Sequence, residues 1–334
     1  MTLKSAARTI AIAILILMIG MAGLVAWLFT RPVTLLQTPF EFEVRPGMSL
    51  SAVAHELQGA NVLAQAWPMI ALARLQGVDR AIKAGSYEID SAITLRELLA
   101  RLTQGDVTQA SFTIIEGMTF ADVKRALRAQ GQVRNTVLDL SDSELMTRLG
   151  APGQGAEGRF FPDTYFFSSG SSDLALLRRA HRAMNARLAA AWDKRAPDLP
   201  LSTPDEALIL ASIVEKETGR PADRPLIASV FSNRLRHGLR LQTDPTVIYG
   251  MGDKFDGNLR RRDLEADTPW NTYTRDGLPP TPIALPSQAS LDAVMQPPAT
   301  EYLYFVSRGD GSSQFSTNLP DHNRAVAKFQ KGPR

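Results

Sequence analysis

The longest apolar run in the chain covers residues 10–29 and contains no charged side chain. As a helix rising about 1.5 Å per residue, it matches a bilayer core of roughly 30 Å. Lys4 and Arg8 precede the run, and Trp27 stands near its far end. These flanks predict a transmembrane helix after a cytoplasmic tail at 1–9, with the rest of the chain outside the cytoplasm. The alternative is a cleaved signal peptide, which would usually have a shorter apolar region and a small-x-small cleavage site.

Two later segments share one pattern of apolar and polar positions. Residues 42–53 and 112–123 each show alternating apolar side chains, a Gly-Met turn, and then Ser49 or Thr119. Apolar residues follow at the i, i+3 and i+7 positions of one helical face. Each copy therefore predicts a strand, a turn and a helix capped by the hydroxyl group. Between the copies we expect a helix over 67–75, a strand over 85–89 and a helix over 95–102 with Thr94 as its cap.

This strand–Gly-x-Ser/Thr–helix pattern resembles the LysM module, which binds glycans that contain N-acetylglucosamine. We assign residues 30–39 to a linker and 40–110 to a LysM-like subdomain. Residues 111–155 hold the second strand–helix repeat and a connector, which ends in a Gly-rich loop over 150–155. The alternative is that the LysM-like region is only a spacer that supports the fold.

Aromatic side chains are concentrated in residues 157–167, where the third predicted domain, residues 156–330, begins. Such a cluster is typical of a hydrophobic core, although it could also form a floor for sugar rings, with Asp163 and Tyr165 facing a cleft. A long amphipathic helix is expected over residues 173–194.

A helix over about 204–218 has well-marked ends. Thr203 and Glu206 have the spacing of a capping box, Pro204 suits the first helical position, and Gly219 and Pro221 follow the last turn. Residues 208–214 are apolar on nearly all sides, so we expect this helix to be buried.

Two carboxylates stand near the end of this helix, Glu215 and Glu217. At about 100° per residue they are about 200° apart, so they cannot act together on one bond. Glu217 lies at the negative end of the helix dipole among apolar neighbours, which should raise its pKa as a general acid requires. The alternative is an ordinary buried glutamate paired with an arginine such as Arg220 or Arg224.

Composition removes several function classes. The 334 residues include no cysteine, which excludes disulfides, thiolate zinc sites and a cysteine nucleophile. The three bases in residues 1–31 account for the whole net charge of +3, so the remaining chain is charge-balanced and nucleic acid is not an expected partner. The histidines have no metal-ligand spacing and no nucleotide fingerprint is present, so we expect no metal and no cofactor; the histidines are His55, His181, His237 and His322.

The predicted helix ends in Glu217-Thr218, similar to the Glu-Ser ending of the acid-bearing helix in lytic transglycosylases and goose-type lysozymes. An ordered set of further motifs accompanies it: residues 157–167, 230–235, 240–250, 271–273, 277–283, 302–306, 315–318 and 322–323. Together they resemble the endolytic murein transglycosylase family (MltG, YceG-like). One departure is Thr281, where a glycine is common after the Pro-Pro pair.

The resemblance implies an α+β protein with an N-terminal transmembrane helix and a catalytic domain built around a buried helix. It also implies a lyase of the bacterial inner membrane that cleaves peptidoglycan glycan strands between N-acetylmuramic acid and N-acetylglucosamine. Glu217 would protonate the glycosidic oxygen, and its carboxylate would then take a proton from the C6 hydroxyl to give a 1,6-anhydro-N-acetylmuramoyl end. Expected partners are the glycan strands, inner-membrane lipid and penicillin-binding synthases, beside which the enzyme would end strand elongation.

Several residues remain site candidates. Glu215 is the supporting or alternative catalytic residue, and Asp244 is the nearest candidate for a second carboxylate or an orienting residue. The substrate-binding candidates, each equally open to a role in a turn or core, are Gln242, Thr243, Asp244, Tyr249, Asn271, Tyr273 and Asn318. The competing functions are a non-catalytic LysM-like scaffold that recruits synthases and a lysozyme-like hydrolase that would leave reducing ends.

Overall fold

The structure is a computed structural model that describes residues 18, 20, 23, 33, 40–45, 47–89, 93–104, 110–167 and 171–330. The predicted tail at 1–9 lies outside these residues, and so do the predicted membrane helix, apart from residues 18, 20 and 23, and the predicted linker, apart from residue 33. No helix formed by the described residues is both long and apolar enough to cross a membrane. The fold is a mixture of helices and small two-stranded sheets, which confirms the α+β class.

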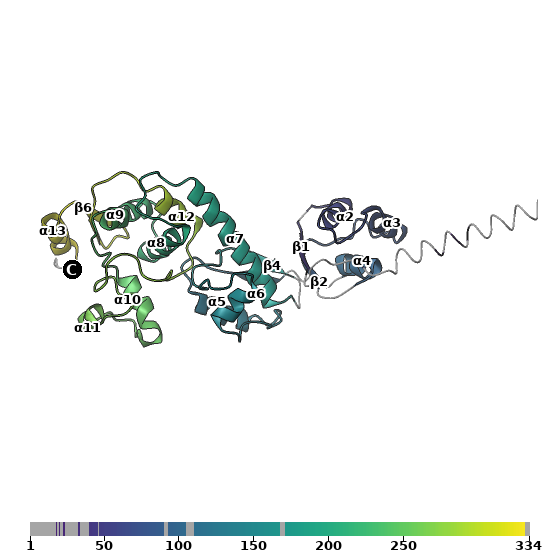
Figure 1. Cartoon of the computed structure of the whole chain (residues 1–334), viewed down its shortest axis with the longest axis horizontal. Coiled ribbons are helices and arrows are strands. Elements are labelled where there is room, and N and C mark those ends of the chain that lie inside the picture. The colour runs from purple at the N-terminus through teal and green to yellow at the C-terminus, as the bar shows by residue number, and fades with distance from the viewer. Residues whose placement is uncertain are drawn as a thin grey trace, which may run out of the picture. The chain divides into compact units, whose positions relative to one another are not determined.

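The described residues fall into two compact units, coloured along the chain in Figure 1. One unit lies within residues 1–111 and 166–171, and the other within 112–165 and 172–334. The first contains β1 (Phe40–Val44), α2 (Leu50–Gly59), α3 (Trp67–Leu75), β2 (Gly85–Ile89) and α4 (Leu95–Gln104). The predicted elements in this region are therefore confirmed, with ends shifted by only a few residues.

In the first unit β1 and β2 pair in antiparallel register, with Phe42 opposite Tyr87. The two rings stack with their centroids 5.5 Å apart. Ser49 caps α2 by accepting a hydrogen bond from the N–H of Ala52, as the pattern predicts. The apolar face of α2, which includes Leu50, is fully buried in the core that the three helices share.

The second unit is built around one buried helix. Two strands, β3 (Ala110–Thr113) and β4 (Thr164–Phe167), pair in a two-stranded sheet. The remaining elements are α5 (Phe120–Ala129), α6 (Asp142–Arg148), α7 (Asp173–Asp193), α8 (Pro204–Glu217), α9 (Arg224–Arg236), α10 (Asp244–Met251), η1 (Gly252–Lys254), α11 (Arg261–Glu265), α12 (Gln288–Met295), β5 (Tyr304–Ser307), β6 (Ser313–Ser316) and α13 (Leu319–Phe329).

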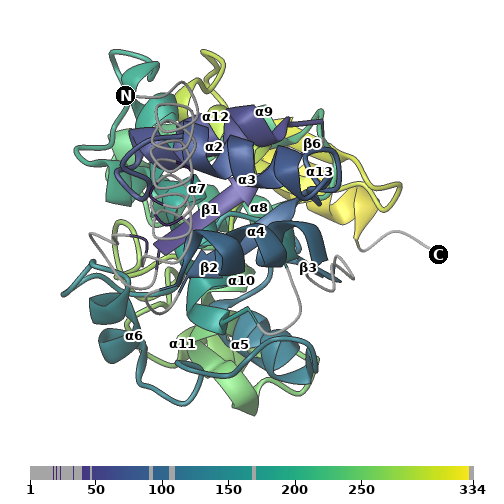
Figure 2. The ribbon, with the colours of Figure 1, turned by 90° about the vertical axis from the view of Figure 1, so that its right-hand side faces the viewer.

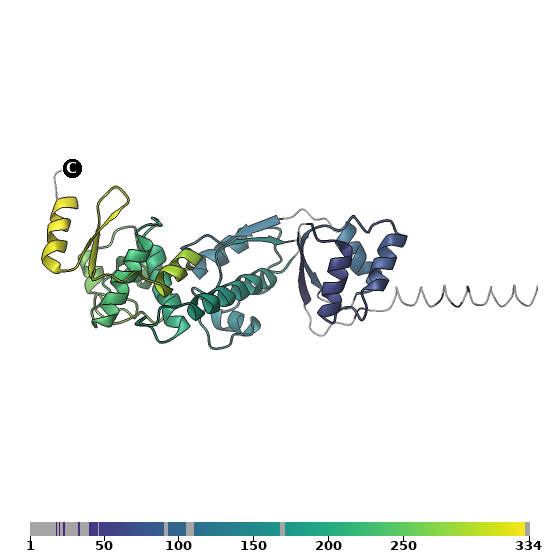
Figure 3. The same ribbon diagram turned by 90° about the horizontal axis from the view of Figure 1, so that it is seen from above.

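Helix α8 is surrounded by other helices. It packs against α7, α9, α10 and α12, and every side chain from Ala207 to Val214 except Ile209 is buried. Figures 1 and 2 show α9 and α12 on one side of α8, with α5, α10 and α11 on the other. The β5–β6 hairpin and α13 lie together near the C-terminus (Figure 3). The prediction of a buried helix is confirmed.

The cap of α8 differs in detail from the prediction. The hydroxyl of Thr203 accepts from the N–H of Glu206, but the Glu206 carboxylate accepts from the N–H of Ser202 instead of that of Thr203. The N–H of Glu206, in the first turn, is thereby satisfied, and the reciprocal bond is displaced by one residue.

The second repeat packs inside the second unit. Thr119 and Asp122 form a complete capping box on α5, and the Gly117–Met118 turn exchanges backbone hydrogen bonds with Leu285. The ammonium of Lys216, from α8, donates to the carbonyl of Gly117 at 3.3 Å. Residues 112–155 and the helix that bears Glu217 are therefore parts of one compact unit.

The aromatic segment at 157–167 is core. Phe160 is fully buried and stacks on Phe120 with centroids 4.6 Å apart, and the hydroxyl of Tyr165 donates to the carbonyl of Phe161. Asp163 is exposed. The core interpretation of this cluster is confirmed for these rings.

Gly158 is the tightest backbone contact in this region. Its φ is +78°, and a Cβ added there would lie 2.5 Å from the Cβ of Pro282. We predict that Gly158→Ala lowers the free energy of unfolding by about 2–4 kcal/mol, because it adds overpacking to left-handed backbone strain. Gly153→Ala is the matched control: its φ is +81° but nothing lies within 4 Å of the added carbon, so only about 1 kcal/mol should be lost. Equal losses in denaturant titrations would contradict the packing argument.

Candidate active site

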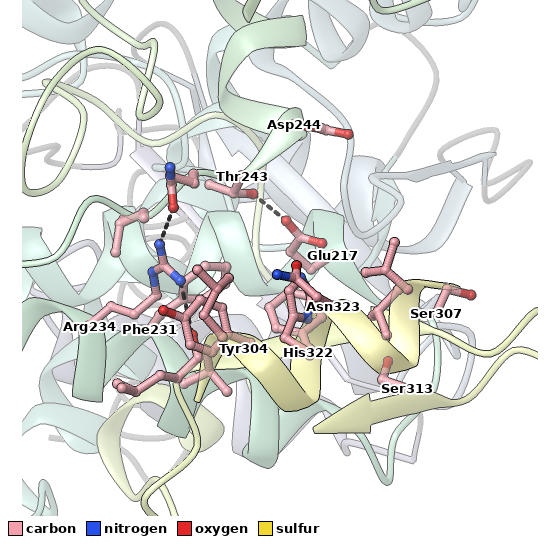
Figure 4. Close-up of a pocket in the computed structure, with 18 of the residues that line it drawn as sticks. Glu217, Phe231, Arg234, Thr243, Asp244, Tyr304, Ser307, Ser313, His322 and Asn323 are labelled. Carbon is pink, nitrogen blue, oxygen red and sulfur yellow. Dashed lines mark hydrogen bonds between the residues drawn. The ribbon is translucent and has the colours of Figure 1, made fainter. Parts of the chain in front are cut away.

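A cavity of about 590 Å³ opens in the second unit where the C-terminal end of α8 meets α9, α13 and the β5–β6 hairpin. Figure 4 draws 18 of the residues that line it. The full lining consists of Glu217, Val230, Phe231, Arg234, Leu241, Gln242, Thr243, Asp244, Tyr273, Leu303, Tyr304, Phe305, Val306, Ser307, Ser313, Leu319, His322, Asn323, Val326 and Gln330. The cavity thus brings together five of the residues that the sequence nominated: Glu217, Gln242, Thr243, Asp244 and Tyr273.

Glu217 is the last residue of α8. The next residue, Thr218, is extended with φ −149°, so the chain leaves the helix immediately after the carboxylate. Burial of the carboxyl group raises the pKa of Glu217 to about 7; the hydrogen bond from Thr243 opposes this rise and the charge of Asp244 adds to it. Near neutral pH the group can hold a proton and also release it, which general acid–base chemistry requires.

Thr243 holds the Glu217 carboxyl in place through a hydrogen bond from its hydroxyl. Thr243 is itself buried, and its N–H donates to the hydroxyl of Thr272 at 3.1 Å. The hydroxyl of Thr272 also bonds to that of Thr246, in the first turn of α10. The partner of the acid is therefore fixed by two neighbouring hydroxyls instead of by solvent.

Gln242, beside Thr243, has a left-handed backbone with φ +52°, which is unfavourable for a side chain with a Cβ. Its N–H donates to the carbonyl of Thr272 at 3.1 Å, and its side-chain oxygen accepts from the Arg234 guanidinium. Arg234 also donates to the carbonyls of Arg240 and Leu303. These bonds hold the strained residue and so determine where Thr243 stands.

Asp244 has a different environment. It is exposed at the start of α10 and accepts a 2.6 Å hydrogen bond from the Tyr273 hydroxyl. In Figure 4 the carboxylates of Asp244 and Glu217 do not point toward each other. This placement favours an orienting or sugar-binding role for Asp244 over a second carboxylate at the same bond.

Glu215 does not line the cavity. One of its carboxylate oxygens accepts from the hydroxyl of Ser290 and from both the N–H and the hydroxyl of Ser287, the residue that caps α12. The other oxygen lies 3.8 Å from the Arg224 guanidinium. The two carboxylates at the end of α8 face different surroundings, as the helical geometry predicts, and that of Glu215 bonds to residues at the start of α12.

Three other nominated side chains bond elsewhere and do not line the cavity. The hydroxyl of Tyr249 donates to Glu157 at 3.2 Å. Asn271 is fully buried and donates to the carbonyls of Leu264 and Ala266. Asn318 caps α13 by accepting from the N–H of Asp321. These contacts are the turn and core roles that the sequence left open for them.

Glu157 is a second carboxyl with a pKa of about 7, raised mainly by burial. It accepts from the N–H of Phe120 at 3.0 and 3.2 Å and from Tyr249. Sequence reasoning did not nominate it, since its neighbours in the chain are an aromatic cluster. The described residues offer no group of three or more His, Cys, Asp or Glu side chains suited to a metal ion.

Among the wall residues that the sequence did not nominate are four with polar or aromatic side chains that stand close together: Arg234, Tyr304, His322 and Asn323. They belong to α9, β5 and α13, and they stood among the motifs that carry the family resemblance without an assigned role. No local sequence pattern identifies them as site residues, because they come from separate elements and only the fold brings them to the cavity that Glu217 lines.

A family model described as the YceG-like family matches residues 42–328. A Bacillus subtilis (strain 168) protein named endolytic murein transglycosylase is 29% identical over 310 residues, which cover 88% of this chain and 85% of that protein. A protein of the same name from Streptococcus pneumoniae serotype 2 is 29% identical over 282 residues, covering 74% of this chain and 50% of that protein. A crystal structure of a yceG-like protein from Listeria monocytogenes has a TM-score of 0.54 and 27% identity, covering 86% of this chain and 98% of that one.

The environments of Glu217 and Glu215 predict opposite effects on stability. The folded-state pKa of Glu217 lies above its ordinary value of 4.5, so its contribution to stability is complete below pH 4.5 and is lost as the pH rises through about 7. Glu217→Gln removes that loss. We expect the variant to match the native chain at pH 4.5 and to exceed it above pH 8 by up to about 3 kcal/mol.

Glu215→Gln is the control on the same helix. It places an amide N–H₂ against the donors that cap α12, and we expect a loss of about 1–3 kcal/mol at pH 7. Chemical denaturation at pH 4.5, 7 and 8.5 measures both effects. A Glu217→Gln variant that gains nothing at pH 8.5 would contradict the buried, neutral acid.

Proposed function

The chain belongs to the YceG-like family, and from that premise we propose that it is an endolytic murein transglycosylase whose acid–base residue is Glu217. The observation that carries the proposal is the environment of this carboxyl group. It is desolvated, has a pKa of about 7, accepts a hydrogen bond from Thr243, and faces a cavity of about 590 Å³. The proposed substrate is the glycan strand of peptidoglycan, cleaved within the chain between N-acetylmuramic acid and N-acetylglucosamine.

The proposed reaction uses Glu217 twice. Its proton passes to the glycosidic oxygen as the bond to the anomeric carbon breaks, and the N-acetylglucosamine end leaves with a new hydroxyl. The C6 hydroxyl oxygen of the N-acetylmuramic acid then bonds to the anomeric carbon, and its proton returns to the Glu217 carboxylate. The product is a 1,6-anhydro end, no water is consumed, and the acid is restored for the next cycle.

Attack by the sugar's own C6 hydroxyl suits the positions of the carboxylates, because neither Glu215 nor Asp244 faces the same point as Glu217. A retaining glycosidase with two carboxylates needs the second about 5 Å from the first, on the other side of the sugar. Glu215 bonds to Ser287 and Ser290 at the start of α12, and Asp244 is held by Tyr273 with its carboxylate directed away from Glu217. We assign Gln242, Asp244 and Tyr273 to hydroxyl and acetamido groups of the bound sugars.

The apolar run at 10–29 supports a membrane anchor, with Met1 in the cytoplasm and the enzyme outside it. In a bacterial inner membrane this anchor would hold the cavity near nascent glycan strands. It would also place the chain beside membrane lipid and the penicillin-binding synthases, where cleavage ends strand elongation.

Deletion of residues 1–30 tests the anchor. We expect the truncated chain to appear as a folded protein in the soluble fraction of lysed cells. Full retention of the truncated chain in washed membranes would contradict the single anchor.

The β1–α2–α3–β2 unit supports a LysM-like role in glycan binding. Deletion of residues 40–105 should weaken retention on insoluble peptidoglycan more than it slows cleavage of short glycans, because the cavity lies wholly in the second unit. Pull-down with sacculi and a rate assay on short glycans measure the two effects. An equal loss of both would make this region part of the catalytic fold.

Muropeptide mass spectrometry of digested sacculi tests the catalytic assignment. Glu217→Gln keeps the size of the side chain but cannot supply a proton, so formation of anhydro ends should fall by about a hundredfold or more. Glu215→Gln should cost much less, because its partners are the cap of α12 and Arg224.

The products also separate the competing functions. Sacculi unchanged by the native chain would indicate a non-catalytic scaffold, and new reducing ends would indicate a hydrolase. An active Glu217→Gln chain together with an inactive Glu215→Gln chain of normal stability would reverse the assignment of the two residues.

A further inference from the structure

His322 lies on α13 and faces the cavity across from Glu217 and Thr243 (Figure 4). Its ring stacks on that of Tyr304, with centroids 5.1 Å apart and planes inclined by 24°. The guanidinium of Arg234 lies over the same tyrosine ring, 5.4 Å from its centroid. The stack fixes the plane of the imidazole, so its two nitrogens have well-defined and different surroundings.

The two ring nitrogens of His322 differ in access. Nδ1 is buried and has no hydrogen-bond partner among the described residues. Nε2 does not combine burial with the lack of a partner. A neutral imidazole carries its proton on one nitrogen only. Among backbone groups, a buried N–H without a partner is rarer than an under-satisfied acceptor, and the same preference applied to the ring leaves Nδ1 without a proton. The proton of the neutral ring is then on Nε2.

The surroundings also keep the ring uncharged. Burial lowers the pKa of His322, and the positive charge of Arg234 lowers it further. An imidazolium would place a second N–H at the buried Nδ1 position. It would also stabilise the ionised form of Glu217 in the same cavity and so oppose a raised pKa of the acid.

We propose that His322 contacts the substrate as a neutral hydrogen-bond donor, with Nε2–H directed to an uncharged oxygen of the bound sugar. The acceptor is an acetamido carbonyl oxygen or a hydroxyl oxygen, because these are the neutral acceptors that a glycan strand offers. The contact rests on the proposed function of the cavity, while the state of the ring does not. His322 orients the sugar without adding charge beside the acid.

The protonation state can be measured on the full chain without any substrate. Two-bond proton–nitrogen spectra of the histidine-labelled protein at pH 7 report which ring nitrogen carries the proton, and the signals that vanish in His322→Gln identify His322. We expect a proton on Nε2 and none on Nδ1. An imidazolium or a proton on Nδ1 would overturn the proposal even if the chain proves to be an active transglycosylase.

Three substitutions separate donation from stacking. His322→Gln can return an N–H near the position of Nε2, whereas the shorter side chain of His322→Asn reaches only the depth of Nδ1. His322→Phe keeps a ring against Tyr304 but has no donor. We expect kcat/KM for murein cleavage to fall by about tenfold in the Phe and Asn variants and by about threefold or less in the Gln variant.

The exposed His237, at the end of α9, is the matched control, and His237→Gln should retain native activity. A Phe variant as active as the native chain, or Gln and Asn variants equally impaired, would overturn the proposal. Melting temperatures of all variants identify losses of activity that come from unfolding. Where a variant is unfolded, its activity is set aside and the proton–nitrogen measurement on the native chain decides whether the proposal stands.

Murein with and without its N-acetyl groups distinguishes the two acceptors. If the ratio of native to His322→Phe activity falls to about one on de-N-acetylated murein, the contact is with the acetamido carbonyl oxygen. If the ratio persists, the contact is with a hydroxyl oxygen. A ratio of about one on both substrates would overturn the contact, whereas a native chain inactive on both would refute the proposed function and leave the measured tautomer standing.

Discussion

The proposed reaction requires the carboxyl group of Glu217 to hold a proton near pH 7 while it stays open to the cavity that would receive the sugar. Burial at the end of α8 raises the pKa of the acid, and the hydroxyl of Thr243 limits that rise by favouring the carboxylate. Without burial the group would be ionised, and without a partner its position would not be fixed. The helices packed around α8 supply the burial, and the loop before α10 supplies the partner. Burial and the hydrogen bond therefore come from different parts of the second unit, and both are needed to set the pKa and the position of the Glu217 carboxyl group.

Fixing Thr243 places backbone strain on the residue before it, Gln242. Gln242 has a left-handed backbone, which destabilises a residue with a Cβ by about 1–2 kcal/mol. The Arg234 guanidinium and the carbonyl of Thr272 hold it there, and the same guanidinium lies over the ring of Tyr304, on which His322 stacks. The buried guanidinium of Arg234 therefore contacts both Gln242 and Tyr304, which lie on two sides of the cavity. Its charge disfavours an imidazolium at His322, so a single side chain contributes both geometry and electrostatics to the site.

The sequence predicted what is local and missed what is assembled by the fold. Caps, alternation and helical periodicity located β1, α2, α3, α5 and α8 to within a few residues, because those signals lie within one or two turns of each element. The opposite directions of Glu215 and Glu217 also followed from helical geometry alone. The sequence could not pair Thr243 with Glu217, or place His322 across the cavity from them, because those contacts join separate elements. Tyr249, Asn271 and Asn318 matched polar motifs equally well, but their side chains bond within the structure instead of lining the cavity.

The two carboxyls with a pKa of about 7 show why a raised pKa does not by itself identify a catalytic acid. Glu157 is as strongly shifted as Glu217, yet it accepts hydrogen bonds from Phe120 and Tyr249 and does not line the cavity. Tyr249 belongs to α10, and Thr243 stands immediately before the first residue of that helix, so the two acids bond at opposite ends of one short element. What distinguishes Glu217 is therefore access to the cavity in addition to desolvation, and Glu157 helps to hold the helix from which the partner of Glu217 extends.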